Sequence, residues 1–276
     1  MAGPPPMTMP TRHPRRLRRP RTILVVGVLA LGALATACAP DPGPPPPNPD
    51  VCDAPVGSTA ASVKVMGPCS RLSVDQIVAW FDSVPKASTW SYKASVPLRD
   101  LVTYYVEEGN AEGVRGDIAF AQAIIESGYF SSTIAQTKNN FAGLGAIDTD
   151  PLGGAATFPD ARTGVRAQIQ HLRAYADATA TTCAQPPLHN PCVDPRFNLV
   201  SPKGKAPTWN QFGNGKWATD PTYASKIIGQ ASDPTSDPYK GVYTRMLEKF
   251  GLPLAERTTT ERSTSPRSIL WNASST

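Results

Sequence analysis

Residue types that many enzymes rely on are scarce in this chain of 276 residues. It has three histidines, and only His171 and His189 lie beyond residue 37. Neither the H-E-x-x-H sequence of zinc proteases nor the G-x-S-x-G turn of serine hydrolases occurs. Five cysteines are too few for a disulfide-dense mini-protein, and they lack the C-x-x-C spacing of zinc sites. We therefore expect no metal and no organic cofactor.

Long hydrophobic runs are also missing. The apolar stretch at residues 23–37 is shorter than the roughly 20 residues that a membrane-spanning helix needs. Six arginines and no acidic residue lie in the first 37 residues, and Ala35-Thr36-Ala37 precedes Cys38. A basic start, a short apolar run and small residues at the cut are typical of a secretory signal peptide. We expect residues 1–37 to be this signal peptide.

The number and spacing of the cysteines indicate which of them is lipidated and which form disulfides. The segment before Cys38 resembles a bacterial lipoprotein site, although that pattern prefers leucine where Ala35 stands. Lipidation of Cys38 would leave an even set of four cysteines: Cys52, Cys69, Cys183 and Cys192. Four cysteines allow three pairings, and proximity favours the two short loops, Cys52–Cys69 and Cys183–Cys192. The sequence thus indicates an exported lipoprotein anchored to the outer face of a membrane. Plain secretion and an uncleaved anchor are the alternatives.

Charge and proline are unevenly distributed. The formal net charge is +5, but loss of residues 1–37 leaves 21 basic and 22 acidic residues. No basic helix or aromatic-basic strip occurs elsewhere, so we expect no nucleic-acid partner. Thirteen of the 30 prolines lie in the first 50 residues. We expect residues 38–51 to form an extended proline-rich tether and residues 52–71 a loop closed by a disulfide.

The remaining sequence predicts a mainly helical domain over residues 72–252. Apolar residues at helical spacing, with capping signals, predict helices at 73–84, 97–109, 116–127 and 163–178. Shorter helices are expected at 208–212, 221–230 and 237–250, and long loops at 138–160 and 181–207. We expect residues 253–276 to be a disordered tail. Long ordered loops on a helical scaffold often carry function.

A carboxylate is the best candidate for catalysis. Glu126 stands at the C-terminal end of an otherwise apolar helix. Partial burial and the negative end of the helix dipole both raise a carboxyl pKa, as a general acid requires. The alternative is an exposed glutamate that makes a surface ion pair. For His171, within a predicted helix, we expect a structural or partly exposed position.

Three sequence blocks, in order, resemble a known family. They are A-Q-A-I-I-E-S-G at 121–128, N-N-F-A-G-L at 139–144 and W-A-T-D-P-T-Y-A-S-K-I-I at 217–228, and the helix near His171 is also similar. These blocks resemble the bacterial glucosaminidase domain, glycoside hydrolase family 73. That family comprises endo-β-N-acetylglucosaminidases that cut peptidoglycan. The resemblance implies a lysozyme-like, mainly α (α+β) fold in which the small β-lobe is shortened.

The resemblance also implies roles for individual residues. Glu126 matches the catalytic acid, and Tyr223 matches a tyrosine lining the cleft, although a tyrosine there also fits the core. The resemblance implies that residues of the cleft loop bind the substrate. Two aromatic residues are also candidates, which either stack on sugars or belong to the core. These candidates are Asn139, Asn140, Gly143, Phe141 and Trp217.

The second acidic residue of the family has no clear match. Asp148, Asp150 and Asp160 lie in the right region, and Asp148 is our candidate second carboxylate. The substrate's 2-acetamido group could instead act as the nucleophile, a known exception to the two-carboxylate scheme. We expect a monomer that hydrolyses the β-1,4 bond after N-acetylglucosamine in peptidoglycan. The alternatives are a lytic transglycosylase and a non-catalytic cell-wall-binding lipoprotein.

Overall fold

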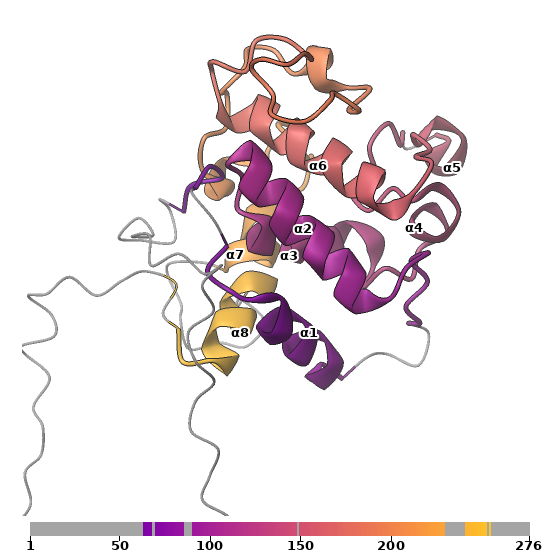
Figure 1. Cartoon of the computed structure of the whole chain (residues 1–276), viewed down its shortest axis with the longest axis vertical. Coiled ribbons are helices and arrows are strands. Elements are labelled where there is room, and N and C mark those ends of the chain that lie inside the picture. Colours follow the sequence, from indigo (N-terminus) through magenta and orange to yellow (C-terminus); the bar gives the residue numbers. More distant parts are fainter. Residues whose placement is uncertain are drawn as a thin grey trace, which may run out of the picture. The chain divides into compact units, whose positions relative to one another are not determined.

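The computed structural model describes residues 63–67, 70–85, 90–147, 149–229, 241–252 and 254. The expected signal peptide and tether, the lipidation site Cys38 and the Cys52–Cys69 pair lie outside these residues, as do Asp148 and nearly all of the expected tail. The described part is mainly helical (Figure 1), which confirms the predicted fold class. Its helices are α1 (Val74–Ser83), α2 (Leu98–Glu112), α3 (Gly116–Ser127), α4 (Thr133–Lys138), α5 (Pro151–Gly154), α6 (Ala161–Ala176), η2 (Phe197–Leu199), η3 (Trp209–Gln211), α7 (Tyr223–Ile228) and α8 (Val242–Lys249).

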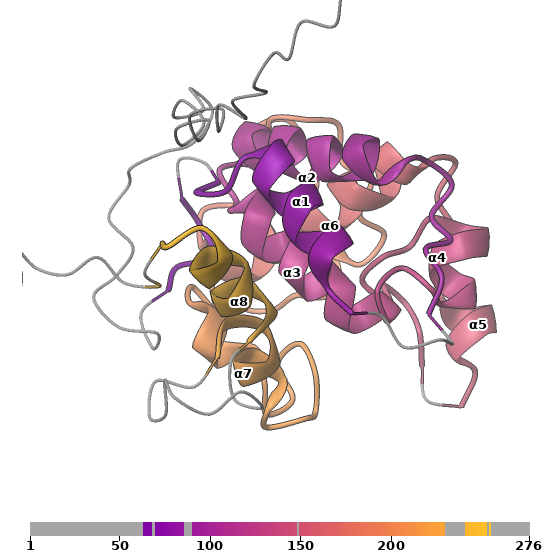
Figure 2. The ribbon, with the colours of Figure 1, turned by 90° about the horizontal axis from the view of Figure 1, so that it is seen from below.

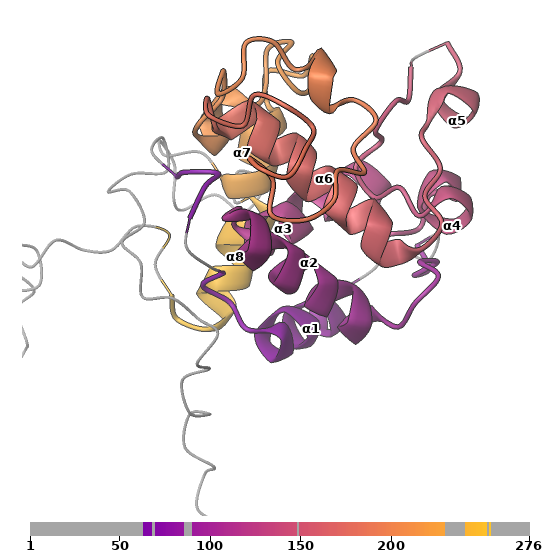
Figure 3. The ribbon, with the colours of Figure 1, turned by 45° about the horizontal axis from the view of Figure 1, so that its top comes forward.

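The α3 helix is the centre of the domain. It packs against α2, α6, α7 and α8, and nearly all of its side chains are buried. Views from two directions show α2 and α6 running beside it, with α7 and α8 on another side (Figures 2 and 3). Because α3 is buried on nearly all sides it has no solvent-facing polar face, and its polar residues Asp117 and Gln122 are buried as well. The last turn of this central helix carries Glu126.

Local sequence signals explain most helix boundaries. Ser73 and Gln76 form the predicted capping box at the start of α1, with hydrogen bonds of 3.1 and 3.0 Å. Gly128 ends α3 in a left-handed conformation with φ +57°, where glycine has no steric penalty. The start of α7 is fixed by Asp220, which accepts a hydrogen bond from the Thr222 amide at 2.7 Å. This contact places Tyr223, the first residue of α7.

One helix end was predicted wrongly. Gly109 and Asn110 suggested the end of the second helix, but α2 continues to Glu112 and is capped by Gly113. The glycine at 109 serves close packing instead. A Cβ atom there would lie 2.7 Å from the Val114 carbonyl oxygen and 2.8 Å from the Gly116 Cα. Gly109 therefore lets the helix lie against the start of α3, and glycine is tolerated within a helix when packing requires it.

The small lobe after the cleft loop differs from the expected one. In the described residues between 139 and 160 there is no extended strand, and one isolated bridge joins Ile147 and Asp150. The short helix α5 lies within the region that was expected to be a long loop at 138–160. The sequence did not predict α4, α5 or η2, because segments of three to six residues are too short to show a helical period.

The predicted Cys183–Cys192 disulfide is present in the long loop after α6. Two carboxylates of α2 fix this loop to the helices. Glu108 accepts hydrogen bonds from Arg162 and Arg166 of α6 and from the Asn190 side chain, and Glu112 accepts one from Arg173. Both glutamates are buried. Across the described ranges, no helix is long and apolar enough to cross a membrane.

Candidate active site

Glu126 sits where three segments of the chain meet. Its Oε1 accepts a hydrogen bond of 2.8 Å from the Trp217 indole and another from the Tyr223 hydroxyl. The three residues come from α3, from the loop before α7 and from α7 itself. Sequence reasoning named all three, and the structure brings them into direct contact.

The second oxygen of Glu126 is placed differently. No hydrogen bond to Oε2 is formed within the described residues. It faces Gly143, where a Cβ atom would lie 3.6 Å away. Gly143 has φ +62°, a conformation that favours glycine. The positive φ accounts for glycine at this position, and Oε2, which has no hydrogen-bond partner in the described residues, is available to carry a proton.

Burial raises the pKa of the Glu126 carboxyl, and the hydrogen bonds from Tyr223 and Trp217 offset only part of this effect. The sequence also predicted a raised pKa for this carboxyl. A carboxyl group that keeps its proton at higher pH than an ordinary glutamate is suited to general acid catalysis.

A buried chain of hydrogen bonds supports Tyr223 from behind. The Gln122 amide donates to the Tyr223 hydroxyl at 2.8 Å, and the Gln168 amide donates to Gln122 Oε1 at 2.9 Å. The Tyr105 hydroxyl donates to Gln168 Oε1 at 2.6 Å. Every donor in this chain points toward Glu126. Because Gln122 already donates to the Tyr223 oxygen, the Tyr223 proton is directed at the carboxylate. Sequence reasoning missed Tyr105, Gln122 and Gln168 in this role, although the A-Q-A block contains Gln122.

Asn140 shapes the loop beside Glu126. Its Nδ2 donates to the carbonyl oxygens of Leu144 and Ala156 at 2.9 and 3.0 Å, while its Oδ1 accepts from the Leu144 amide at 3.0 Å. Asn139 ends α4 with φ +49°, and its Nδ2 donates to the Phe158 carbonyl. Both asparagines therefore hold the loop in shape through their own side chains.

The two aromatic candidates lie in different surroundings. Phe141 is 1% exposed and packs against Phe130 with ring centres 5.8 Å apart, so it belongs to the core. Trp217 is partly exposed, and its ring lies 5.1 Å from that of His171. It also lines a pocket of about 260 Å³ beside the carboxylate. The other lining residues are Ala142, Gly143, Leu144, Gly145, Ala146, His171, Tyr175, Arg196, Leu199, Val200 and Lys216.

The candidate second carboxylates are otherwise engaged or not described. Asp150 caps α5 and accepts from the Gly153 amide at 2.8 Å, and Asp160 caps α6 and accepts from the Thr163 amide at 2.7 Å. Asp148 lies outside the described residues. No group of three or more potential metal ligands occurs in the described part of the chain.

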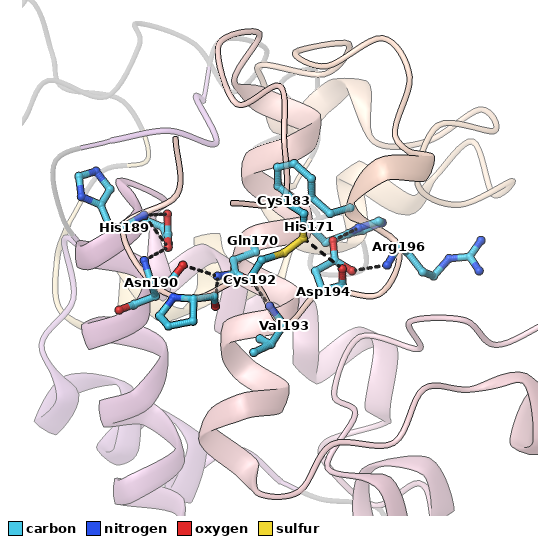
Figure 4. The surroundings of a disulfide bond; sticks show 12 residues. Gln170, His171, Cys183, His189, Asn190, Cys192, Val193, Asp194 and Arg196 are labelled. Atoms are coloured by element: carbon cyan, nitrogen blue, oxygen red, sulfur yellow. Dashed lines mark hydrogen bonds and ion pairs between the residues drawn. A yellow bond between two sulfur atoms is a disulfide. The ribbon is translucent and has the colours of Figure 1, made fainter. Parts of the chain in front are cut away.

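Sequence reasoning did not identify Asp194. This buried carboxylate lies 2.7 Å from Nδ1 of His171 (Figure 4), and His171 also lines the pocket. His171 is 7% exposed, in agreement with a structural position. The two residues are 23 positions apart and join α6 to the loop that contains the Cys183–Cys192 disulfide, so no local pattern in the sequence predicts their contact.

Comparison with known proteins shows similarity over part of the chain. A family model named Glucosaminidase, described as mannosyl-glycoprotein endo-β-N-acetylglucosaminidase, matches residues 102–233. An uncharacterised protein of Borreliella burgdorferi is 38% identical over 125 residues, which make up 45% of this chain and 56% of that protein. The chain thus matches about half of the relative's length. The family match includes Glu126, the 139–143 loop, Trp217 and Tyr223.

Proposed function

We propose, on the premise that residues 102–233 form a glucosaminidase-family domain, that this protein hydrolyses the β-1,4 bond after N-acetylglucosamine in peptidoglycan. The family supports a glycosidase acting on cell-wall glycans. The finer assignment is supported by one observation above all: a partly buried carboxyl with a raised pKa, held by Tyr223 and Trp217 beside a pocket.

Glu126 is the general acid in this proposal. Its Oε2 donates a proton to the oxygen of the leaving sugar as the bond to C1 breaks. The carboxylate left behind is stabilised by the two hydrogen bonds to Oε1. Glu126 then takes a proton from the water molecule that attacks C1, which returns it to the starting state.

The nucleophile in the first step is the 2-acetamido oxygen of the substrate. It forms a bond to C1 while the leaving oxygen departs with the Glu126 proton, and water later opens the resulting ring. This route needs one protein carboxylate, and it fits a site where Asp150 and Asp160 serve as helix caps. Asp148 remains the alternative second carboxylate.

Mass spectrometry of digested peptidoglycan tests this assignment. Hydrolysis after N-acetylglucosamine gives fragments with new reducing N-acetylglucosamine ends. Fragments with 1,6-anhydro ends would identify a lytic transglycosylase instead. Binding to the wall with no release of fragments would identify a non-catalytic wall-binding protein.

We also propose that the protein acts outside the cell, as a monomer, anchored by a lipid on Cys38. The support is the sequence of residues 1–38 and the nature of the substrate. Cys38→Ala should release the protein from the membrane fraction into the medium. An unchanged membrane fraction would argue for an uncleaved anchor.

A further inference from the structure

The pocket beside Glu126 is basic. Its titratable lining residues are His171, Tyr175, Arg196 and Lys216, and no aspartate or glutamate is among the lining residues. Lys205 also lies close, with its Nζ 4.7 Å from the centre of the Tyr175 ring. This concentration of positive charge stands out in a chain that carries a net charge of −1 once residues 1–37 are removed. The field in the pocket therefore favours an anionic group.

Of the basic residues in the pocket wall, His171 faces the buried Asp194 carboxylate, whereas Arg196 and Lys216 have no carboxylate partner within the described residues. The guanidinium of Arg196 forms no hydrogen bond or ion pair within the described residues. Lys216 Nζ donates to the Lys205 carbonyl oxygen at 2.9 Å, a neutral partner. A guanidinium beside a pocket presents paired N–H donors that match the geometry of a carboxylate.

Arg196 is held in place from its backbone. Its amide donates to Asp194 Oδ1 at 2.9 Å, while Asp194 Oδ2 contacts His171. The Cys183–Cys192 disulfide closes the loop two residues before Asp194. In Figure 4 the Arg196 side chain points away from this cluster. The buried carboxylate is therefore used to fix the backbone, which leaves the guanidinium available to a ligand.

The pocket and the candidate catalytic carboxyl share two wall residues. Gly143 faces Glu126 Oε2, and Trp217 donates to Glu126 Oε1, while both line the pocket. The pocket that Arg196 lines therefore adjoins the position of Glu126. In peptidoglycan the neighbouring muramic acid carries a lactyl group, which ends in a carboxylate or continues into a peptide with further carboxylates.

We propose that this pocket binds a carboxylate of the muramic acid substituent through Arg196, with Lys216 adding positive charge. The exposed side chain of Leu199, also in the wall, offers an apolar contact to the small methyl groups of the lactyl or peptide chain. The inference rests on the proposed function and adds a preference for anionic, muramic acid-containing glycan.

A binding experiment with the full chain carrying Glu126→Gln tests the proposal without cleavage of the ligand. The ligands are three soluble glycan preparations: with peptides attached, with peptides removed so that the lactyl carboxylate is free, and the latter with its carboxylates converted to methylamides. When Arg196→Gln is added, the dissociation constant should rise roughly tenfold, because one charge-assisted hydrogen bond to the ligand is lost. Arg196→Lys should retain part of the affinity because it keeps the charge.

The pattern across the three ligands decides the result. Weakening with the peptide-free glycan but not with the peptide-bearing form or the methylamide identifies the lactyl carboxylate, and weakening only with peptides attached identifies a carboxylate of the peptide. Weakening with both carboxylated forms but not with the methylamide shows that the pocket accepts either carboxylate. Equal weakening with the methylamide, or none with any ligand, overturns the proposal. Lys249→Gln, an exposed lysine on α8, removes the same charge away from the pocket and should change nothing. If Lys249→Gln weakened binding as much as Arg196→Gln, the proposal would also be overturned.

The proposed function is judged separately. If the wild-type protein releases no reducing N-acetylglucosamine ends from peptidoglycan, the catalytic assignment fails while the binding result stands.

Discussion

Removing one hydroxyl group, in Tyr223→Phe, should change both the rate and the pH dependence of catalysis. The hydroxyl is one of two donors to Glu126 Oε1. A hydrogen bond to a charged group contributes about 1.5–3 kcal/mol. Its loss destabilises the carboxylate that remains after proton transfer, so kcat should fall roughly ten- to hundredfold.

The direction of the pH effect follows from the same contact. The Tyr223 hydrogen bond lowers the pKa of Glu126 against the larger, opposite effect of burial. Without the hydroxyl, the pKa of Glu126 rises further, and the acid keeps its proton to higher pH. Since a general acid is active when protonated, the alkaline limb of the rate profile should move to higher pH.

The stability cost is also expected. Gln122 loses the acceptor for its buried Nε2, and an unsatisfied buried donor costs about 1–3 kcal/mol. Tyr243→Phe is a matched control, because the Tyr243 hydroxyl is buried and donates to the Asp117 carboxylate at 2.8 Å, in a different cluster. It should lower stability yet leave the pH profile in place. The assay is the initial rate of peptidoglycan solubilisation over a pH series for both variants. An alkaline limb that stays in place, or moves to lower pH, in Tyr223→Phe would refute the reasoning.

Three further variants test other contacts. Glu126→Gln should stabilise the fold at neutral and alkaline pH but not in acid. The pKa of Glu126 is raised in the folded protein, so wild-type stability falls as the pH rises from the ordinary glutamate range through the folded pKa, and glutamine does not ionise. Thermal melting over a pH series checks this. Glu108→Gln should cost about 1–3 kcal/mol in urea unfolding at neutral pH, since it weakens charge-assisted hydrogen bonds to two partly exposed arginines, of which Arg162 keeps its ion pair with Glu107. In the wild type, burial would raise the pKa of Glu108, but Arg166 and Arg162 hold it below its usual range, so this contribution should be lost as pH falls through that lowered pKa. Gly143→Ala should cost about 1–2 kcal/mol for its positive φ, while its Cβ would only touch Glu126 Oε2 at an ordinary contact distance of 3.6 Å; urea titration measures the loss of stability.

Much of the helical scaffold could be predicted from the sequence. The capping box at Ser73, the apolar run before Glu126 and Gly128 after it gave the bounds of α1 and α3, because these signals act over three or four residues. Gly109 misled the prediction. Its glycine is needed for the close approach of α3, a tertiary constraint that looks the same in sequence as a helix end.

The site was predictable in part. The motif blocks named Glu126, Tyr223 and Trp217, and these three are in contact. The supporting chain from Tyr105 through Gln168 was not predictable, because its members lie 63 residues apart and meet only when α2 packs against α6. Asp194 was missed for a related reason: it contacts His171 only because the loop after α6 folds back onto that helix.

The rate of peptidoglycan cleavage by Glu126→Gln tests the central claim most directly. Glutamine keeps the shape of the side chain and can still accept from Tyr223 and Trp217, but it has no acidic proton. General acid catalysis typically contributes about 10²–10⁴-fold, so the folded variant should release reducing N-acetylglucosamine ends at least about a hundredfold more slowly than the wild type. Release at the wild-type rate would show that Glu126 is not the acid and would contradict the mechanism.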